Sequence, residues 1–206
     1  MLLMRAVAAR YPQVAFHLNE ELTGNVMDQL LHGRIDLALF SAIDLPPQVV
    51  FSALIEEDFY LIHRADAADA PAAGEVCLAQ ALARPLVFPS QAHGHCTRTL
   101  VEHAVKQHGL AVGEIVMEVN SVHILKSAVE AGIGHTIMPL NLAVREIDDG
   151  RLVAHRIAAD GLTRTLGICS CASMPASHLK TLISELIREV VHAMCACGEW
   201  PGGRAR

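Results

Sequence analysis

The sequence predicts an α/β fold made of two similar lobes, and three features of the chain support this prediction. Near-continuous apolar stretches alternate with amphipathic helical stretches, which is typical of a sheet flanked by helices. This alternation fills the first 40 residues and returns after residue 78. Between these regions lie two apolar stretches, 49–54 and 58–63, which we expect to be strands that cross from one lobe to the other.

The composition agrees with two small lobes that share an aliphatic type of core. The chain has 206 residues, of which 52% are hydrophobic and 4% are aromatic. No apolar run reaches the about 18 residues that a membrane-spanning helix needs, and the N-terminus lacks the features of a signal peptide. We therefore expect a cytoplasmic protein. The net charge of −6 without a basic stripe disfavours direct binding of nucleic-acid phosphates.

The first lobe is predicted to open on a helix followed by a strand. Leu3, Val7 and Tyr11 lie four residues apart, which indicates one apolar helical face, and Pro12 ends that helix. Residues 14–18 alternate between apolar and other side chains, which predicts a strand. A β-α-β unit opens on a strand, whereas this chain opens on a helix, so we expect the first strand of the lobe to be missing.

A second helix and strand follow in the first lobe. Asn25 is predicted to cap the helix and Gly33 to end it, before a strand at 35–40. Asp36 is unusual because it is an ionisable residue at the start of so apolar a strand. We expect it to be partly buried, with a structural role, and to be bound by backbone N–H groups or by Arg34.

The second lobe is predicted to repeat the same order, and a long helix is predicted to close the chain. Gly109 and Gly132 are the expected ends of two of its helices. The expected elements are a helix at 78–83, a strand at 86–88, a helix at 97–108, a strand at 115–119, a helix capped by Ser121 and a strand at 135–138. A helix at 177–194 follows, and residues 198–206 are expected to be a frayed tail.

The cysteines and histidines do not form a metal-binding pattern. The six cysteines include two C-x-C pairs, whereas zinc sites are typically built from C-x-x-C. We expect free thiols: Cys77, Cys96, Cys169, Cys171, Cys195 and Cys197. His93, His95 and Cys96 offer three ligand types in one loop, but a single loop is weak support for a site. We predict neither a metal nor a cofactor.

Catalytic motifs are also missing, so we predict that the chain is not an enzyme. The sequence contains no G-x-S-x-G, H-E-x-x-H, P-loop or G-x-G-x-x-G motif. The lone G-x-G at 132–134 is expected to end a helix and to let a strand pack closely. The acidic run at 56–58 is expected to be a solvated turn.

Small and hydroxyl-bearing residues follow the predicted strands, and these are the candidate binding residues. Ligands of open α/β sheets bind at the carboxyl ends of the strands. The starts of the helices at Asn25, Thr97 and Ser121 would suit an anion, but they would equally suit ordinary caps, and the sequence leaves both interpretations open. The predicted set is Thr23, Gly24, Asn25, Ser41, Ser90, Gln91, His93, Asn120, Ser121 and Gly134.

The order of these segments resembles the effector-binding domain of LysR-type transcriptional regulators. The matching phrases are RYPQVAFHLNEELTG, LLHGRIDLALF, VFSALIEEDFYLIHRAD, LARPLVFPS, LKSAVEAGIGHTIMPLNLA and GRLVAHRI, which together cover nearly the whole chain. Within this family the chain looks most like the nitrogen assimilation control and sulfur-regulation type, through HLNEELTG and FPSQAHG.

The resemblance implies two Rossmann-like lobes with a central cleft, similar to type 2 periplasmic binding proteins. Lobe I would comprise 1–62 and 170–206, and lobe II 63–169. A small effector would bind between the lobes. A small acid or anion would suit the few cationic groups near the loops, chiefly His93, Arg98 and His123. The alternatives are a solute-binding protein of the same fold serving a transporter, and a small enzyme on a related fold.

The resemblance also implies an oligomer and a DNA-binding segment. Full-length members carry an N-terminal winged helix-turn-helix and a linker helix, which this sequence lacks, so we expect DNA binding only through such a segment. A homodimer or tetramer would place Leu3 and Val7 of one chain against Val101 and Val105 of another.

Overall fold

The computed structural model describes residues 2–21, 23–41, 43–72, 74–90, 96–175 and 177–206. Contacts divide the chain into unit 1, Met1–Glu56 with Thr165–Arg206, and unit 2, Glu57–Arg164. These boundaries fall six and five residues before those predicted for the lobes (56 against 62 and 164 against 169). In the part of the chain that is described, no helix combines the length and apolar character needed to cross a membrane.

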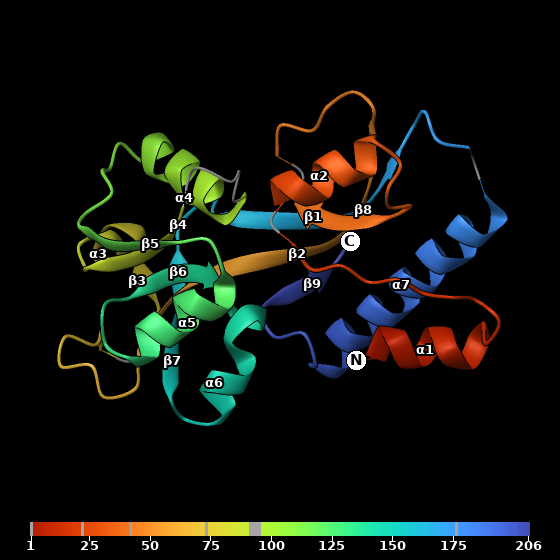
Figure 1. Cartoon of the computed structure of the whole chain (residues 1–206). Coiled ribbons are helices and arrows are strands. Elements are labelled where there is room, and N and C mark those ends of the chain that lie inside the picture. The colour runs from red at the N-terminus through yellow and green to blue at the C-terminus, as the bar shows by residue number, and fades with distance from the viewer. Residues whose placement is uncertain (1, 22, 42, 73, 91–95, 176) are drawn as a thin grey trace. The chain divides into compact units, whose positions relative to one another are not determined.

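Helices and strands alternate through both units (Figure 1). The helices are α1 Leu2–Arg10, α2 Thr23–Leu31, α3 Leu78–Leu82, α4 Cys96–Gln107, α5 Val122–Glu130, the 3₁₀ helix η2 Leu140–Ala143, α6 Val144–Asp148 and α7 His178–Cys197. The strands are β1 Ala38–Ser41, β2 Val49–Arg64, β3 Val76–Cys77, β4 Leu86–Pro89, β5 Ile115–Val119, β6 Thr136–Pro139, β7 Leu152–Ala158, β8 Thr163–Cys171 and β9 Gly203–Ala205.

In unit 1, α1 and α7 pack on the strands β2 and β8. Strand β1 runs antiparallel to β8, with Ala38 opposite Cys169 and Ser41 opposite Leu166. Helix α7 buries one stripe, and Val7 of α1 joins the same cluster, so these two helices lie side by side (Figure 1). The buried stripe consists of Ile183, Leu186, Ile187 and Val191.

Residues 14–18 do not form the predicted strand. They are extended and exposed or partly exposed, and Phe16 and Leu18 are 37% and 53% exposed. A strand needs a neighbour for its backbone groups, and among the described strands β1 pairs only with β8. The segment instead lines a groove of about 470 Å³ together with residues of α7 and the start of β1.

Two further predictions for the first lobe are wrong in detail. Helix α2 begins at Thr23, so Asn25 lies in its first turn and is not its cap. Asp36 precedes the strand, and its side chain is 75% exposed, with Lys180 Nζ 3.0 Å from its carboxylate. It is therefore a surface carboxylate paired with a lysine of α7. Gly33 ends α2 as predicted, with a φ of 67° that suits glycine.

The tail is ordered by ion pairs and a short strand. Strand β9 pairs with β2, and the backbone N–H of Arg206 donates to the carbonyl of Leu54. The guanidinium groups of Arg204 and Arg206 both bind the Glu56 carboxylate. The prediction of a frayed tail is therefore wrong, because these contacts fix residues 203–206.

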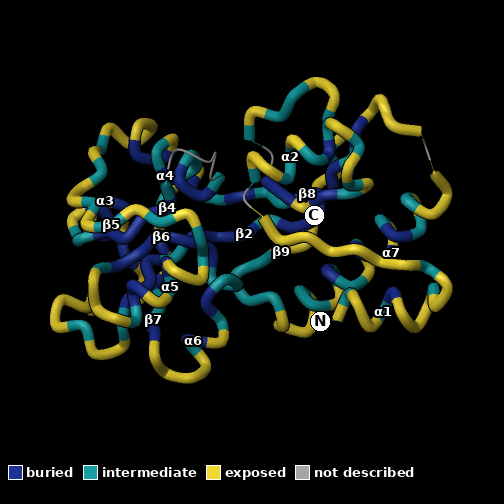
Figure 2. Tube along the Cα trace, viewed as in Figure 1, coloured by how far each residue is buried: buried dark blue, intermediate teal, exposed yellow. Residues whose placement is uncertain are grey.

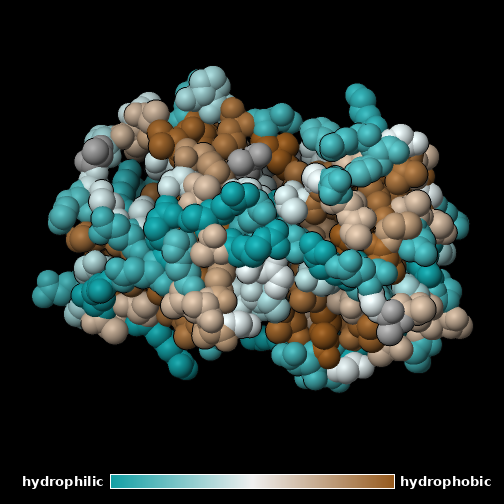
Figure 3. Space-filling model, turned by 180° about the vertical axis from the view of Figure 1, so that it is seen from behind, coloured by the Kyte–Doolittle hydropathy of each residue, from teal (hydrophilic) through white to brown (hydrophobic). Residues whose placement is uncertain are grey.

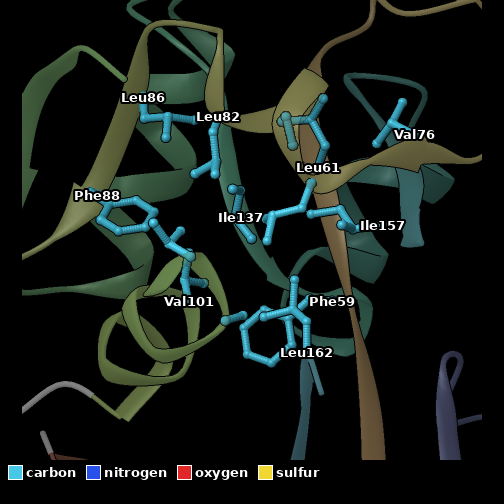
Figure 4. Packing of buried hydrophobic residues seen from close by; sticks show 14 residues of the cluster. Phe59, Leu61, Val76, Leu82, Leu86, Phe88, Val101, Ile137, Ile157 and Leu162 are labelled. Atoms are coloured by element: carbon cyan, nitrogen blue, oxygen red, sulfur yellow. The ribbon is translucent and has the colours of Figure 1, made fainter. Parts of the chain in front are cut away.

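Unit 2 contains the strands that the sequence predicted most accurately. Strands β4 and β5 are parallel, and His135, just before β6, forms a parallel bridge with Leu86. Strand β2 pairs antiparallel with β6 and β7, and β3 pairs parallel with β7. Buried residues concentrate in these strands (Figure 2). Leu61, Ile137 and Ile157 point toward one another in the aliphatic core that α3 and α4 cover (Figure 4).

The two predicted crossing strands are one strand, β2, and the acidic run lies inside it. Glu57 and Asp58 are 1% and 7% exposed, so the predicted solvated turn is wrong. Arg164 Nε lies 2.5 Å from Glu57 Oε2, and Arg156 Nε lies 3.0 Å from Asp58 Oδ2. These arginines supply the opposite charges that buried carboxylates require.

Candidate functional site

In unit 2, three predicted residues lie at one edge of the β4–β5 pair. Both strands end there because they are parallel. The backbone N–H of Ser90 donates to the Val119 carbonyl at 2.8 Å, which ties the residue after β4 to the last residue of β5. Asn120 and Ser121 follow Val119 directly. Ser90, Asn120 and Ser121 therefore share the carboxyl edge, as predicted.

The helix starts at this edge differ in what their hydroxyl groups do. Ser121 caps α5, and its hydroxyl accepts a hydrogen bond from the Ile124 N–H at 3.5 Å, so the cap interpretation is confirmed. Thr97, in the first turn of α4, is only 2% exposed. Its Oγ1 has no hydrogen-bond partner among the described residues. A buried hydroxyl without a partner is uncommon in native proteins and needs an explanation.

Arg98 lies at this edge, and its charge is already neutralised by two carboxylates. It is 7% exposed, its Nε donates to Glu102 at 2.7 Å, and its Nη1 donates to Glu118 at 2.5 Å and to the Pro89 carbonyl at 3.0 Å. Its guanidinium carbon also lies 5.4 Å from the centre of the Phe88 ring. Arg98 therefore braces the end of β4, and a ligand anion would have to compete with two carboxylates for it.

In unit 1, the predicted residues lie at the start of α2 and the end of β1. Helix α2 and β1 are packed neighbours joined by the short connection 32–37, so the start of the helix lies near the end of the strand. Thr23 is partly buried, whereas Gly24 and Asn25 are exposed. Ser41 is 2% exposed, and its Oγ has no hydrogen-bond partner among the described residues. Ser41 in unit 1 and Thr97 in unit 2 thus each carry a buried hydroxyl group that has no partner among the described residues, and Thr136 at the start of β6 carries a third.

Gly134 does not belong with Ser90 and Asn120. It precedes β6, at the amino end of the parallel strands, and the backbone next to it bonds to Pro85, just before β4. A Cβ at Gly134 would lie 2.8 Å from the Pro85 carbonyl oxygen and 3.1 Å from a methyl of Val116. This glycine allows the strands to pack closely, which is the role expected from the sequence for the G-x-G at 132–134. Gln91 and His93 lie outside the described residues.

Three of the four predicted dimer contacts lie in the interiors of their own units. Val7, Val101 and Val105 are 2%, 0% and 6% exposed and pack in the cores of their own units, and Leu3 packs against the core of unit 1. Val7, Val101 and Val105 are thus covered by their own chain, whereas Leu3 is partly exposed, and contact of these residues with a second chain stays a prediction. The apolar stripes of α1 and α4 cover strands and helices of the same chain.

The thiols have contrasting environments. All six cysteines are free, and the described residues contain no cluster of three or more His, Cys, Asp or Glu that would hold a metal ion. Burial raises the pKa of the Cys169 thiol to about 12, so it stays protonated. The hydrogen bond from Ser173, which lies 3.1 Å away, lowers the pKa of the Cys171 thiol.

A family model described as the LysR substrate binding domain matches residues 1–191. The chain belongs to this family. The HTH-type transcriptional regulator BbuR of Bordetella bronchiseptica is 23% identical over 97% of this chain and 60% of its own length. The nitrogen assimilation regulatory protein nac of Klebsiella aerogenes is 24% identical over 93% of this chain and 60% of its own length. The chain thus spans about 60% of the length of these relatives.

Solved structures of effector domains share the fold. The Synechocystis CcmR regulatory domain in complex with 2-PG superposes with a TM-score of 0.81 at 16% identity, over 93% of this chain and 90% of that one. The effector-binding domain of QuiR in complex with shikimate gives a TM-score of 0.79 at 15% identity, over 92% and 88% of the two chains. The α/β fold predicted from the sequence, similar to type 2 periplasmic binding proteins, is confirmed by these comparisons.

Proposed function

We propose that this chain is the effector-binding part of a LysR-type transcriptional regulator and that it binds a small polar acid. The family match over residues 1–191 carries this proposal. The relatives that match are transcriptional regulators, and two neighbours of the same fold hold 2-PG and shikimate, both small acids. We further propose that the regulator contacts DNA through a winged helix-turn-helix and not through these residues, that this chain is not an enzyme, and that it is cytoplasmic.

The buried hydroxyl group of Ser41 in unit 1 and that of Thr97 in unit 2 are each proposed, independently of the other, to offer a hydrogen bond to an effector. Leaving a buried hydroxyl unpaired costs about 1–3 kcal/mol, so their side chains lower the stability of the ligand-free protein. A ligand that supplies the missing hydrogen bonds would recover this energy. Ser90 and Asn120 are proposed to contribute further polar contacts from the same edge of unit 2 as Thr97.

Hydrogen bonds are proposed to dominate recognition over ion pairs. Arg98 is held by two carboxylates, and the residues proposed to contact the effector carry hydroxyl or amide groups and no positive charge. An effector with one carboxylate or phosphate and several hydroxyl groups matches this set of donors and acceptors. Inorganic anions that offer only charge are expected to bind less well.

A thermal-shift screen of the purified chain tests the proposal. Shikimate, 2-PG, amino acids and inorganic sulfate would be compared for wild type, Ser41→Ala and the control Ser127→Ala, whose hydroxyl lies on the exposed side of α5. A small acid should raise the Tm of wild type and of the control equally, and that of Ser41→Ala by less. Equal shifts in all three proteins would exclude Ser41 from the site.

A further inference from the structure

Three buried histidines lie at one end of the sheet of unit 2. His63 of β2, His155 of β7 and His135 just before β6 are 2%, 7% and 5% exposed. The ring centres of His63 and His155 are 5.1 Å apart, and those of His63 and His135 are 5.5 Å apart. Each histidine lies two residues along its strand from Leu61, Ile137 or Ile157, so the rings extend the apolar face seen in Figure 4.

The hydrogen bonds of His63 and His155 require three protons on two rings. His63 Nδ1 lies 2.7 Å from the Arg64 carbonyl oxygen, and His155 Nδ1 lies 3.1 Å from the Gly74 carbonyl oxygen. A carbonyl only accepts, so both Nδ1 atoms carry hydrogen. The two Nε2 atoms are 3.0 Å apart and need one more proton between them. The pair with all bonds formed therefore carries one positive charge.

Loss of the third proton removes one of these bonds. If both Nδ1 atoms keep their hydrogens, the two Nε2 lone pairs face each other at 3.0 Å and repel. If His155 instead carries its hydrogen on Nε2, its Nδ1 lone pair faces the Gly74 carbonyl oxygen. Gly74 lies in a surface connection, whereas both strands are paired in the sheet, so the bond to Gly74 is the one expected to break.

His135 contacts the same connection through a second charge-dependent pair. Its Nε2 lies 3.5 Å from Asp69 Oδ1, and neither of its ring nitrogens has a hydrogen-bond partner among the described residues. Only the protonated ring attracts the Asp69 carboxylate strongly. Arg84 Nη1 lies 3.4 Å from the same carboxylate. Arginine stays charged over the whole range in which histidine titrates, so this contact does not depend on pH.

We propose that the His63–His155 pair and His135 form a proton-dependent clasp on the described residues of the connection between β2 and β3, 65–72 and 74–75. When the histidines are protonated, the clasp binds the connection at Gly74 and at Asp69. When they are neutral, the connection keeps the Arg84–Asp69 pair and the hydrogen bond from the Ala65 N–H to the Arg151 carbonyl. Figure 2 shows that most of this connection is exposed, so its order depends on such contacts.

Burial keeps the pKa values of His63 and His135 on the acidic side of the ordinary histidine range. Burial, with the positive charge of Arg84, lowers the pKa of His63 and of His135 below 6.5, and the Asp69 carboxylate opposes this shift. The other charged groups around the clasp are already paired. They are Arg64 with Asp66 from β2 and the connection, and Arg156 with Asp58 and Glu75 from β7, β2 and the segment before β3.

Nuclear magnetic resonance of the whole chain between pH 5 and 8.5 tests the clasp. In wild type we expect the His63–His155 pair to hold three protons at the acidic end, and amide exchange at 65–72 and 74–75 to slow by about fivefold, after correction for intrinsic rates, as expected for one ordinary hydrogen bond gained. His155→Phe and Asp69→Asn should each reduce this slowing. His103→Phe, at an exposed position on α4, should leave it unchanged.

Three results would overturn the proposal. The first is a His63–His155 pair that holds only two protons down to pH 5. The second is amide exchange at 65–72 and 74–75 that has the same pH dependence in wild type and in Asp69→Asn, a variant chosen because Asp69 is half exposed and its loss should not unfold the chain. The third is binding of added Zn²⁺ to His63 and His155, seen as a shift of their ring signals in wild type and as no shift of the His63 signals in His155→Phe. A metal ion would then take the place of the shared proton. None of these measurements depends on effector binding.

Discussion

Arg164 and Glu57 form an ion pair inside unit 2, with Arg164 Nε 2.5 Å from Glu57 Oε2 and side chains that are 8% and 1% exposed. The two residues belong to β8 and β2, and unit 2 begins at one of them and ends at the other. Both charges have lost most of their contact with water, so each depends on the other.

Replacing one member of this pair is expected to be severely destabilising. Glu57→Gln leaves the Arg164 charge buried without its partner, which typically costs about 3–5 kcal/mol. The free energy of unfolding, measured by urea denaturation, should fall accordingly. Glu189→Gln is the control, because the Arg10–Glu189 pair is 52% and 58% exposed and such pairs contribute at most about 1 kcal/mol. Equal losses in both variants would contradict the assigned burial.

Val101→Glu is expected to unfold unit 2 rather than to separate subunits. Val101 is 0% exposed and packs in the core with Phe88, so a carboxylate there would be buried without a partner. Circular dichroism should show a greatly lowered Tm. Lys106→Glu, on the exposed side of α4, should leave the Tm nearly unchanged. A Val101→Glu protein with the wild-type Tm but an altered sedimentation coefficient would instead support a subunit interface at this residue.

Unit 2 is expected to lose stability as the pH falls below about 6.5. Burial lowers the pKa of His63 and His135 in the folded chain below this ordinary value, so the unfolded chain binds more protons between the two values. The contribution of these histidines is present above pH 6.5 and is lost as the pH falls through their folded pKa values. Urea denaturation at pH 7.5 and 5.5 measures the loss, and His135→Phe should reduce it. A free energy of unfolding that rises toward pH 5.5 would contradict the assigned shift.

The elements with strong periodicity are those that the sequence predicted well. Strands β4, β5 and β6 and helices α4, α5 and α7 lie within a few residues of their predicted places, because each carries its own apolar pattern and its own glycine or serine boundary. The acidic run 56–58 was misjudged because the arginine partners of its carboxylates lie about 100 to 150 residues further along the chain. Local composition contains no sign of such partners.

The candidate site shows the same division. Ser90 and Asn120 were placed correctly because the carboxyl ends of parallel strands meet at one edge. Gly134 was predicted at the wrong edge of the sheet. A residue between a helix and the following strand lies at the amino end of that strand, opposite the carboxyl edge that holds Ser90 and Asn120. The apolar stripe of α4 was correctly identified but assigned to a partner, since periodicity alone does not say which surface covers a stripe. Several separate hydrophobic patches do remain exposed (Figure 3), and none of the predicted interface residues is among the exposed large hydrophobic residues.

Effector binding through the buried hydroxyl groups is tested most directly by Thr97→Val. The substitution replaces a buried hydroxyl, which has no partner among the described residues, by a methyl group of similar shape. Thermal denaturation of wild type and Thr97→Val, each alone and with shikimate or 2-PG, gives the Tm without ligand and the increase in Tm that the ligand causes. The Tm without ligand should rise, by the equivalent of about 1 kcal/mol, and the increase caused by a binding acid should shrink. A lower Tm without ligand together with an undiminished ligand effect would show that the Thr97 hydroxyl is structural.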